Sequence, residues 1–322
     1  MSCTKSKELL YKTSLMKTAF LSTSHRTLEL PKTLHKNSEV VFCVTKEDVK
    51  VGRHQKTKKN EIKVWADKHK LVCLQISGLE KNSADQIIEH INTSKPDLIL
   101  MADFAFIIPG EILEAAGERL VNVHFSLLPK YRGAAPGQFA ILNGDDKTGI
   151  TFQHVHKEVD QGNILHQVEY KLTHKETAGE LYESLFELAN AELPKFLEKY
   201  EKGDVTPLPQ DENLATYTRS RTNPDNLRVE KEDAYVELTE SPEAIERTVR
   251  AFTPWPIVWT HLKNFRDMGF KLKDREKESL RVKLHNVEVR GNVLKITELQ
   301  VEGKNKIGWE EFENGYLAMD SV

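Results

Sequence analysis

Three polar residues in the middle of the chain could act together on one reacting atom. In Val121-Asn122-Val123-His124, alternate side chains of an extended strand point the same way, so Asn122 and His124 share one face. An asparagine amide can donate a hydrogen bond to a developing oxyanion, and a histidine can share that role or carry a proton. Asp160 follows the next expected strand and could orient His124 or accept a proton through water. These residue types suit transfer of an acyl carbon between two nitrogens.

Spacing alone does not decide that role. An asparagine and a histidine two residues apart on a strand are more often surface or structural groups than catalytic ones. No Gly-x-Ser-x-Gly or Cys-His signature appears, which favours direct attack by the substrate over a covalent enzyme intermediate. His154 and His156 could join His124 and Asp160 in the metal site of a hydrolase. No His-Glu-x-x-His helix or other ligand spacing supports that alternative, so we expect no metal.

The elements that must position these residues alternate between strands and helices. Apolar β-branched runs predict strands, and segments with helical spacing and Pro or Gly boundaries predict helices. The predicted strands cover 16–21, 40–44, 98–101, 120–124 and 149–156, and the predicted helices cover 27–35, 83–95, 109–117, 136–144 and 176–200. This alternation predicts an α/β fold with a Rossmann-like, mostly parallel sheet. Ligands of such sheets bind outside the carboxyl ends of the strands, where Asn122 and His124 fall.

Length and composition indicate two domains. A chain of 322 residues with 39% hydrophobic and 30% charged residues can bury at least one sizeable core. Residues 1–15 are polar and unpatterned, so we expect an N-terminal extension there. We place the first domain at 16–203, a polar, Pro-containing linker at 204–233 and the second domain at 234–322.

The second domain has a different pattern from the first. A helix is predicted near 242–252, and strand-like runs follow at 282–284, 287–289 and 293–296. Short strands of this kind predict a small antiparallel sheet or a β-barrel-like domain of the OB type.

Composition also excludes several classes of protein. No run approaches the roughly 20 apolar residues that a membrane helix needs, and the N-terminus lacks a secretory apolar core, so we expect a cytoplasmic protein without a membrane partner. The three cysteines contain no Cys-x-x-Cys pair, which argues against a disulfide framework or a zinc knuckle. A net charge of -3 excludes a uniformly basic nucleic-acid binder but permits local basic patches.

Longer motifs around the three polar residues resemble a known family. The run from Asn122 to Pro136, with Thr148-Gly-Ile-Thr-Phe and the run from Asp160 to Leu165, resembles the folate-dependent formyltransferases. The later stretches that agree are 209–212, 215–217, 250–256, 299–304 and 312–316. The C-terminal matches favour the members that act on methionyl initiator transfer RNA. The resemblance implies that Asn122, His124 and Asp160 are catalytic, that 10-formyltetrahydrofolate is the formyl donor and that methionyl initiator tRNA is the acceptor.

The same resemblance implies where the reduced folate binds. In that family the pterin ring lies against loop backbone, and a site with apolar walls and a few polar edges suits such a ring. Two loops depart from the family pattern, because Ser22-Thr23-Ser24 replaces Gly-Thr-Pro and Asp103-Phe104-Ala105 replaces Ala-Tyr-Gly. The donor-binding residues implied here are Phe104, Ala105, Phe106, Ile107, Ser126, Leu127, Leu128, Pro129, Val155 and Val159.

Two basic segments could follow an RNA backbone. Residues 53–59 hold four fixed positive charges and no acid, in an expected loop. The run Val51-Gly52-Arg53 at its start resembles the family's acceptor-stem loop. A second excess of basic residues lies between 263 and 283. A solvated loop and a mixed-charge exposed surface explain the same residues, so both interpretations stay open. The candidates for tRNA contact are Arg53, Lys56, Lys58, Lys59, Lys273 and Arg275.

Two other functions remain open at this point. The catalytic motif is shared with enzymes that formylate sugars, so a folate-dependent amino-sugar nucleotide N-formyltransferase is one alternative. A catalytically idle RNA-binding protein that keeps the fold is the other. For any of the three we expect a monomer.

Overall fold

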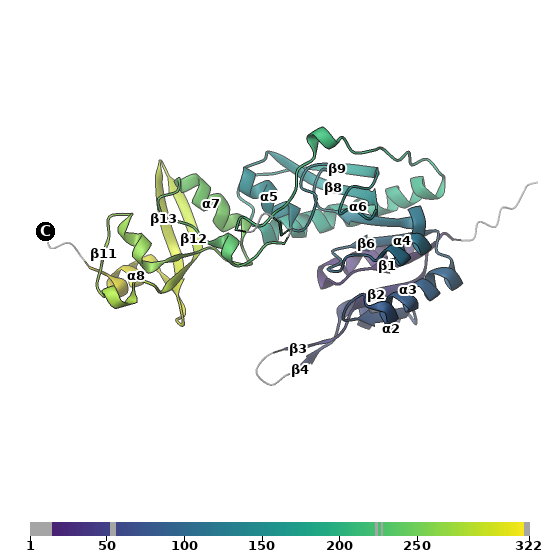
Figure 1. The fold of residues 1–322 in the computed structure, drawn as a ribbon, viewed down its shortest axis with the longest axis horizontal. Coiled ribbons are helices and arrows are strands. Elements are labelled where there is room, and N and C mark those ends of the chain that lie inside the picture. The colour runs from purple at the N-terminus through teal and green to yellow at the C-terminus, as the bar shows by residue number, and fades with distance from the viewer. Residues whose placement is uncertain (1–14, 52–55, 223–224, 227, 319–322) are drawn as a thin grey trace, which may run out of the picture. The chain divides into compact units, whose positions relative to one another are not determined.

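The computed structural model describes residues 15–51, 56–222, 225–226 and 228–318 (Figure 1). It divides into two compact units, the first made of the described part of Met1–Val121 with Glu192–Asp204, and the second of Asn122–Ala191 with the described part of Val205–Val322. The expected N-terminal extension lies almost entirely outside the described residues. It therefore stays a prediction.

The first unit is built on parallel strands buried on both faces. Strand β1 pairs in parallel with β2 and β6, and β2 pairs in parallel with β5. All five residues of β6 are buried, as expected for a central strand of a parallel sheet. The strands are β1 (Lys17–Leu21), β2 (Glu39–Lys46), β5 (Val72–Ile76) and β6 (Leu98–Ala102), and the helices are α1 (Glu29–Asn37), α2 (Glu61–Lys68), α3 (Lys81–Ser94) and α4 (Gly110–Ala116).

Local sequence signals account for the ends of these helices. Helix α3 stops at Lys95, which adopts the left-handed conformation with φ 50° directly before Pro96. Pro31 lies in the first turn of α1, where its missing N–H would have no partner in the helix. The Asn60 side chain caps α2 by accepting hydrogen bonds from the Ile62 and Lys63 amides. Helix α2 and strand β5 were not predicted.

The basic segment after β2 differs from its prediction. Residues 53–59 were expected to be loop, but Lys56–Lys58 form strand β4, which pairs antiparallel with β3 (Val49–Val51). The two strands make a narrow ribbon beyond the end of β2 (Figure 1). Arg53 lies outside the described residues.

Strands β7 (Leu120–His124), β8 (Lys147–His154) and β9 (Ile164–Lys171) continue the sheet, whose strand order is β5-β2-β1-β6-β7-β8-β9. Strand β9 was not predicted; it is an edge strand and runs antiparallel to β8. Helix α5 (Pro136–Asn143) begins with a proline and ends before Gly144, while α6 (Ala178–Glu201) is the long helix expected there. The predicted α/β fold with a mostly parallel sheet is confirmed.

The C-terminal part of the second unit is a small antiparallel β domain, as expected. Residues 282–289 were expected to form two strands but belong to one, with register shifts around Asn286. The elements of this β domain are α7 (Pro242–Ala251), β10 (Trp259–His261), β11 (Lys271–Leu272), β12 (Arg281–Arg290), β13 (Val293–Val301), β14 (Lys306–Gly308), α8 (Trp309–Tyr316) and β15 (Leu317–Ala318). Strands β10-β12-β13-β14 form one sheet, and β11 pairs with β15.

One apolar core supports this β domain. Phe252, Phe265 and Phe312 are almost completely buried in it, together with alternate residues of β12 and β13. Short 3-10 turns connect elements throughout the described chain, at His25–Thr27, Gly117–Arg119, Glu212–Leu214, Glu232–Ala234, Leu262–Arg266 and Arg275–Lys277. None of the helices within the described residues has the length and apolar character to cross a membrane.

Burial on β13 can be tested with two matched substitutions. Val301 is 1% exposed and Val293 is 66% exposed on the same strand. Both Val→Ala changes lose the same intrinsic strand preference, but only Val301→Ala removes buried methyl groups. We expect Val301→Ala to lower the free energy of unfolding by about 2 kcal/mol more than Val293→Ala, measured by urea denaturation. Equal effects of the two substitutions would contradict this packing.

Candidate active site

His124 is fixed at the carboxyl end of β7. Its side chain is almost fully buried, and its Nε2 lies 2.9 Å from the carbonyl oxygen of Tyr131. Because a carbonyl can only accept, Nε2 carries the hydrogen of this bond. The other ring nitrogen, Nδ1, lies 3.5 Å from Oδ2 of Asp160. Nδ1 is therefore the nitrogen that can exchange a proton or a hydrogen bond with a substrate.

The Asp160 carboxylate is held by donors on both of its oxygens. The amide of Gly133 donates to Oδ2 at 2.8 Å, and Nε2 of the buried Gln153 donates to Oδ1 at 2.7 Å. Asp160 itself adopts the left-handed backbone conformation, with φ 54°. A non-glycine residue in this region needs support from its surroundings. Here the support comes from contacts that also aim the carboxylate at His124.

Asn122 lies two residues before His124 on β7 and is partly exposed, whereas its neighbours Val121 and Val123 are buried. Strand alternation puts its side chain on the same side of the sheet as that of His124. An amide in this position is open to a bound molecule and can donate a hydrogen bond to it. The expected pairing of His124 with Asp160 is thus present, and Asn122 stands beside it on the strand.

The turn that follows Asp160 has no room for a side chain at position 162. A Cβ atom there would lie 1.8 Å from the carbonyl oxygen of His154, which is a backbone atom and cannot move away alone. The carbonyls of Asp160 and Gly162 both accept from Nε2 of Gln210, at 2.9 and 2.8 Å. The backbone of His154 on one side and the side-chain amide of Gln210 on the other therefore fix the conformation of this turn.

Arg132 was not predicted as a site residue. It is completely buried, and its guanidinium donates to both carboxylate oxygens of Glu212 at 2.7 and 2.8 Å, to Oε1 of Gln210 at 2.9 Å and to the hydroxyl of Tyr217 at 2.9 Å. The hydrogen bonds from Arg132 hold the pKa of the Glu212 carboxyl below its usual range. Both segments lie in the motifs that carry the family resemblance, but no spacing rule shows that they touch.

The expected linker at 204–233 is therefore tied to the site along part of its length. Leu208 exchanges two backbone hydrogen bonds with Ile164, at 2.8 and 2.9 Å. The amide of Arg132 donates to Thr216, and its carbonyl accepts from Thr218, both at 2.8 Å. Residues 208–218 thus line the loops that follow β7 and β8.

Tyr131 links the His124 ring to helix α5. Its hydroxyl donates to Asp145 at 2.8 Å and accepts from Nδ2 of Asn143 at 2.9 Å. Burial, and the bond to the Asp145 carboxylate, raise the pKa of Tyr131 to about 12, although the bond from Asn143 opposes the shift. The phenol therefore stays neutral at physiological pH, and the backbone carbonyl of Tyr131 remains fixed as the acceptor for His124.

The residues expected to bind folate lie in both units. In the second unit, Ser126 and Leu128 are buried, while Val159 is 38% exposed. The carbonyl of Leu128 accepts from Gln167 at 2.7 Å, and its amide donates to Thr151 at 3.2 Å. These contacts leave the backbone of the loop fixed. Leu127, Pro129 and Val155 are partly exposed beside it.

In the first unit, the two loops that depart from the family pattern bind each other. The Thr23 hydroxyl donates to the Asp103 carbonyl at 3.1 Å and accepts from the Ala105 amide at 2.9 Å. Arg26 pairs with the Asp103 carboxylate at 3.2 Å. Phe104 and Phe106 meet edge to face with ring centres 5.6 Å apart, and Ile107 is 73% exposed. The altered residues therefore support one another, and the apolar side chains expected at this loop are present.

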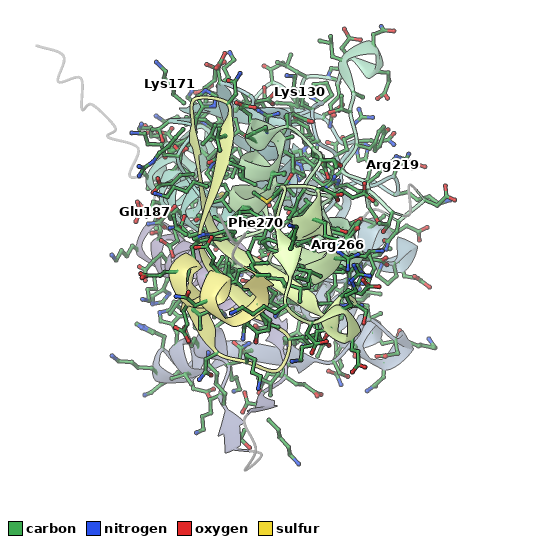
Figure 2. All side chains as sticks on the ribbon, turned by 90° about the vertical axis from the view of Figure 1, so that its left-hand side faces the viewer. Lys130, Lys171, Glu187, Arg219, Arg266 and Phe270 are labelled. Carbon is green, nitrogen blue, oxygen red and sulfur yellow. The ribbon has the colours of Figure 1, made fainter. Side chains whose placement is uncertain are left out.

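The candidates for tRNA contact are described only in part. Lys58 and Lys59 are exposed, and Lys58 lies 3.7 Å from Glu61. Arg275 is exposed, and Lys273 donates to the carbonyl of Asn314. Arg266, labelled in Figure 2, pairs with Glu278 at 2.6 Å, which offsets part of the charge excess in this region. Arg53 and the side chain of Lys56 lie outside what the structure describes.

The histidines considered for a metal site do not form one in the described structure. His154 is buried on β8, and His156 follows that strand. Over residues 15–51, 56–222, 225–226 and 228–318, no group of three or more His, Cys, Asp or Glu side chains is placed to hold a metal ion.

Comparison with known proteins gives the family. A model of the formyl transferase family matches residues 16–197, and a model of the formyl transferase C-terminal domain matches residues 228–317. The chain belongs to the formyl transferase family. This formyl transferase is 31% identical over 313 residues to methionyl-tRNA formyltransferase of Bacillus mycoides, a match covering 94% of this chain and 96% of that protein. It is 32% identical over 318 residues to the Bacillus cereus protein of the same name, with the same coverage.

Solved structures share the fold at lower identity. A structure of HypX from Aquifex aeolicus in complex with tetrahydrofolic acid is 17% identical and has a TM-score of 0.58, covering 95% of this chain and 51% of that one. A sugar 3N-formyl transferase is 18% identical with a TM-score of 0.57, covering 90% of this chain and 99% of that one. These likenesses show a common fold.

The Gly162 turn offers a direct test of the site's geometry. Gly162→Ala forces a Cβ against the His154 carbonyl, and overpacking of this kind costs about 1–3 kcal/mol. We expect a melting temperature several degrees below that of the parent, measured by calorimetry. Gly110→Ala is the matched control, because nothing lies within 4 Å of a Cβ at that helix start. Equal melting temperatures for Gly162→Ala and Gly110→Ala would contradict the close approach of Gly162 to the His154 carbonyl.

Proposed function

We propose that this formyl transferase moves the formyl group of 10-formyltetrahydrofolate to the α-amine of methionine esterified to initiator tRNA. The observation that carries the proposal is that His124 at the end of β7 faces Asp160 after β8, in a chain with full-length methionyl-tRNA formyltransferase relatives. Those relatives are 31–32% identical over 94% of this chain. The sugar 3N-formyl transferase structure is only 18% identical. The full-length relatives therefore support an RNA acceptor.

The reaction proceeds by direct attack of the methionine amine on the formyl carbon. The carbonyl oxygen becomes an oxyanion, and the Asn122 amide donates a hydrogen bond to it. His124 shares this role or carries a proton through Nδ1, because its Nε2 hydrogen is engaged by the Tyr131 carbonyl. Asp160 orients the ring and accepts, through water, the proton that the amine loses. The C–N bond to N10 then breaks, and the leaving nitrogen takes up a proton.

The proposed binding surfaces for folate and tRNA are made of the residues that the family resemblance implies. Folate would lie against the loop backbone at 126–129 and 155–159 of the second unit, and the resemblance separately implies the apolar residues at 104–107 of the first unit. The candidates for contact with methionyl tRNA are Lys58 and Lys59 of the first unit, near Arg53 and Lys56 in sequence, and separately Lys273 and Arg275 of the second unit. We assign catalysis to residues 16–203 and RNA contact to residues 234–322, with contributions from the β3–β4 ribbon.

One assay separates the three candidate functions. The purified protein is incubated with 10-formyltetrahydrofolate and either methionyl initiator tRNA or an amino-sugar nucleotide. We expect formyl transfer to the RNA. Transfer to the sugar instead would identify a sugar enzyme, and salt-dependent RNA binding without turnover would identify an idle binder.

The same assay tests the residues. Asn122→Ala should lower kcat by about 10²–10³-fold, because removal of one oxyanion donor has that cost. Asp160→Ala should abolish detectable transfer and leave circular dichroism unchanged. Asp204→Asn and Asn213→Ala are the controls, because both residues are exposed. We expect both control variants to keep parent activity. Full activity in either site variant rules out this mechanism.

RNA contact can be tested separately from catalysis. Arg275→Ala should weaken binding of initiator tRNA and lower the slope of log affinity against log salt by about 1, because one phosphate contact is lost. The matched control is Lys195→Ala, on α6 with a side chain 69% exposed. Filter binding over a salt series measures both. An unchanged slope for Arg275→Ala would exclude this residue from the RNA surface.

A further inference from the structure

Gln210 connects the two halves of the candidate active site through one side chain. Its Nε2 uses both hydrogens on the Asp160 turn, donating to the carbonyls of Asp160 and Gly162 at 2.9 and 2.8 Å. Its Oε1 accepts from Nε of Arg132 at 2.9 Å. Gln210 thus bonds the backbone on either side of Gln161 and the arginine of the loop after β7. The side chain is satisfied at every polar position.

The residues that Gln210 contacts either bind the Asp160 carboxylate or adjoin a residue that binds it. Gln153, which donates to Oδ1 of Asp160, lies with its Oε1 3.4 Å from Nε2 of Gln210. Arg132 immediately precedes Gly133, whose amide donates to the other oxygen of Asp160. Gln210 therefore contacts one donor to the carboxylate, Gln153, and the neighbour of the other donor, Gly133. A change at Gln210 reaches both oxygens of Asp160 without touching either.

Residues 208–218 form a support for this arrangement that is anchored on both sides. Glu212 and Tyr217 bind the buried Arg132 guanidinium, and the Gln161 amide donates to the Tyr217 hydroxyl at 3.2 Å. The Arg132 backbone bonds Thr216 and Thr218. Residues 208–218 hold the loop after β7 and the turn after β8 at a fixed separation. This separation sets the distance between His124 and Asp160.

We propose that Gln210 is a positioning residue for formyl transfer: it holds the left-handed Asp160 turn so that the carboxylate faces Nδ1 of His124. The proposal rests on the proposed function for its kinetic consequence. Misplacement of a reacting group by about 1 Å can cost about 100-fold in rate. Loss of the Gln210 amide should accordingly lower kcat and leave the binding of both substrates intact, because Gln210 donates to protein carbonyls.

Two substitutions separate positioning from simple support of Arg132. Gln210→Glu keeps an oxygen for Nε of Arg132 but replaces the amide donor with a second oxygen, which would face the carbonyls of Asp160 and Gly162. Gln210→Met keeps the length of the side chain and removes its hydrogen bonds with Arg132, Gln153, Asp160 and Gly162 without adding a charge. Gln86→Glu is the matched control, because it is the same amide-to-carboxylate change at an exposed residue of α3, away from the Asp160 turn.

The full-length variants are compared in steady-state formylation, calorimetry and hydrogen exchange. We expect Gln210→Glu and Gln210→Met to lower kcat by about 10–100-fold. The KM values for 10-formyltetrahydrofolate and methionyl initiator tRNA should stay within about twofold of the parent, and Gln86→Glu should match the parent throughout. Amide exchange should rise in peptides covering 130–134 and 158–163, because the Gly133 amide loses its fixed acceptor.

Two results would overturn the proposal. One is parent kcat in Gln210→Glu, which would mean that the bond to Arg132 is all that matters. The other is a fall in kcat that accompanies a comparable rise in both KM values and exchange throughout the chain, which would mean a general loss of structure. If the parent protein formylates neither acceptor, the proposed function fails, and the local exchange pattern alone then decides whether Gln210 holds the turn.

Discussion

The rest of the site depends on one constraint, the fixed direction of the Asp160 carboxylate. Its two oxygens accept from Gly133 and Gln153, and one of them faces the His124 ring at 3.5 Å. A left-handed backbone at Asp160 and a glycine at position 162 are needed to bring the carboxylate there. The neighbouring loops are arranged to maintain this geometry, and the proposed removal of a proton from the reacting amine depends on it.

The α/β sheet supplies the other half of the constraint. Parallel strands end at one edge, so residues at the end of β7 and after β8 are brought to the same side by topology. Buried Val121 and Val123 anchor β7, and the alternation of the strand then places the side chains of Asn122 and His124 on the same side of the sheet. The Tyr131 carbonyl fixes one ring nitrogen of His124, which leaves the other for chemistry.

Much of this could be predicted from sequence because it depends on local signals. Apolar runs predicted β1, β2, β6, β7 and β8, and helix boundaries at Lys95 and Gly117 followed from backbone preferences of the residues there. Strand alternation placed Asn122 with His124. The edge strand β9 was missed because its residues are only partly buried and lack a continuous apolar run.

The supporting network could not be predicted for a different reason. Arg132 lies 80 residues from Glu212 and 78 from Gln210, and a buried arginine is recognisable only when its partners are known. Residues 204–233 are polar and contain prolines, a composition shared by linkers and by segments bound through hydrogen bonds. Their role at 208–218 depends on backbone pairing with Ile164 and Arg132, which no composition reveals.

The central claim is that His124, held by Tyr131 and Asp160, acts on the formyl group during its transfer. Single-turnover formylation of methionyl initiator tRNA by His124→Asn, with enzyme in excess of RNA, measures this step without product release. The account predicts a loss of about 10²–10⁴-fold in the transfer rate, with tRNA affinity equal to that of the parent. Transfer at the parent rate would contradict it.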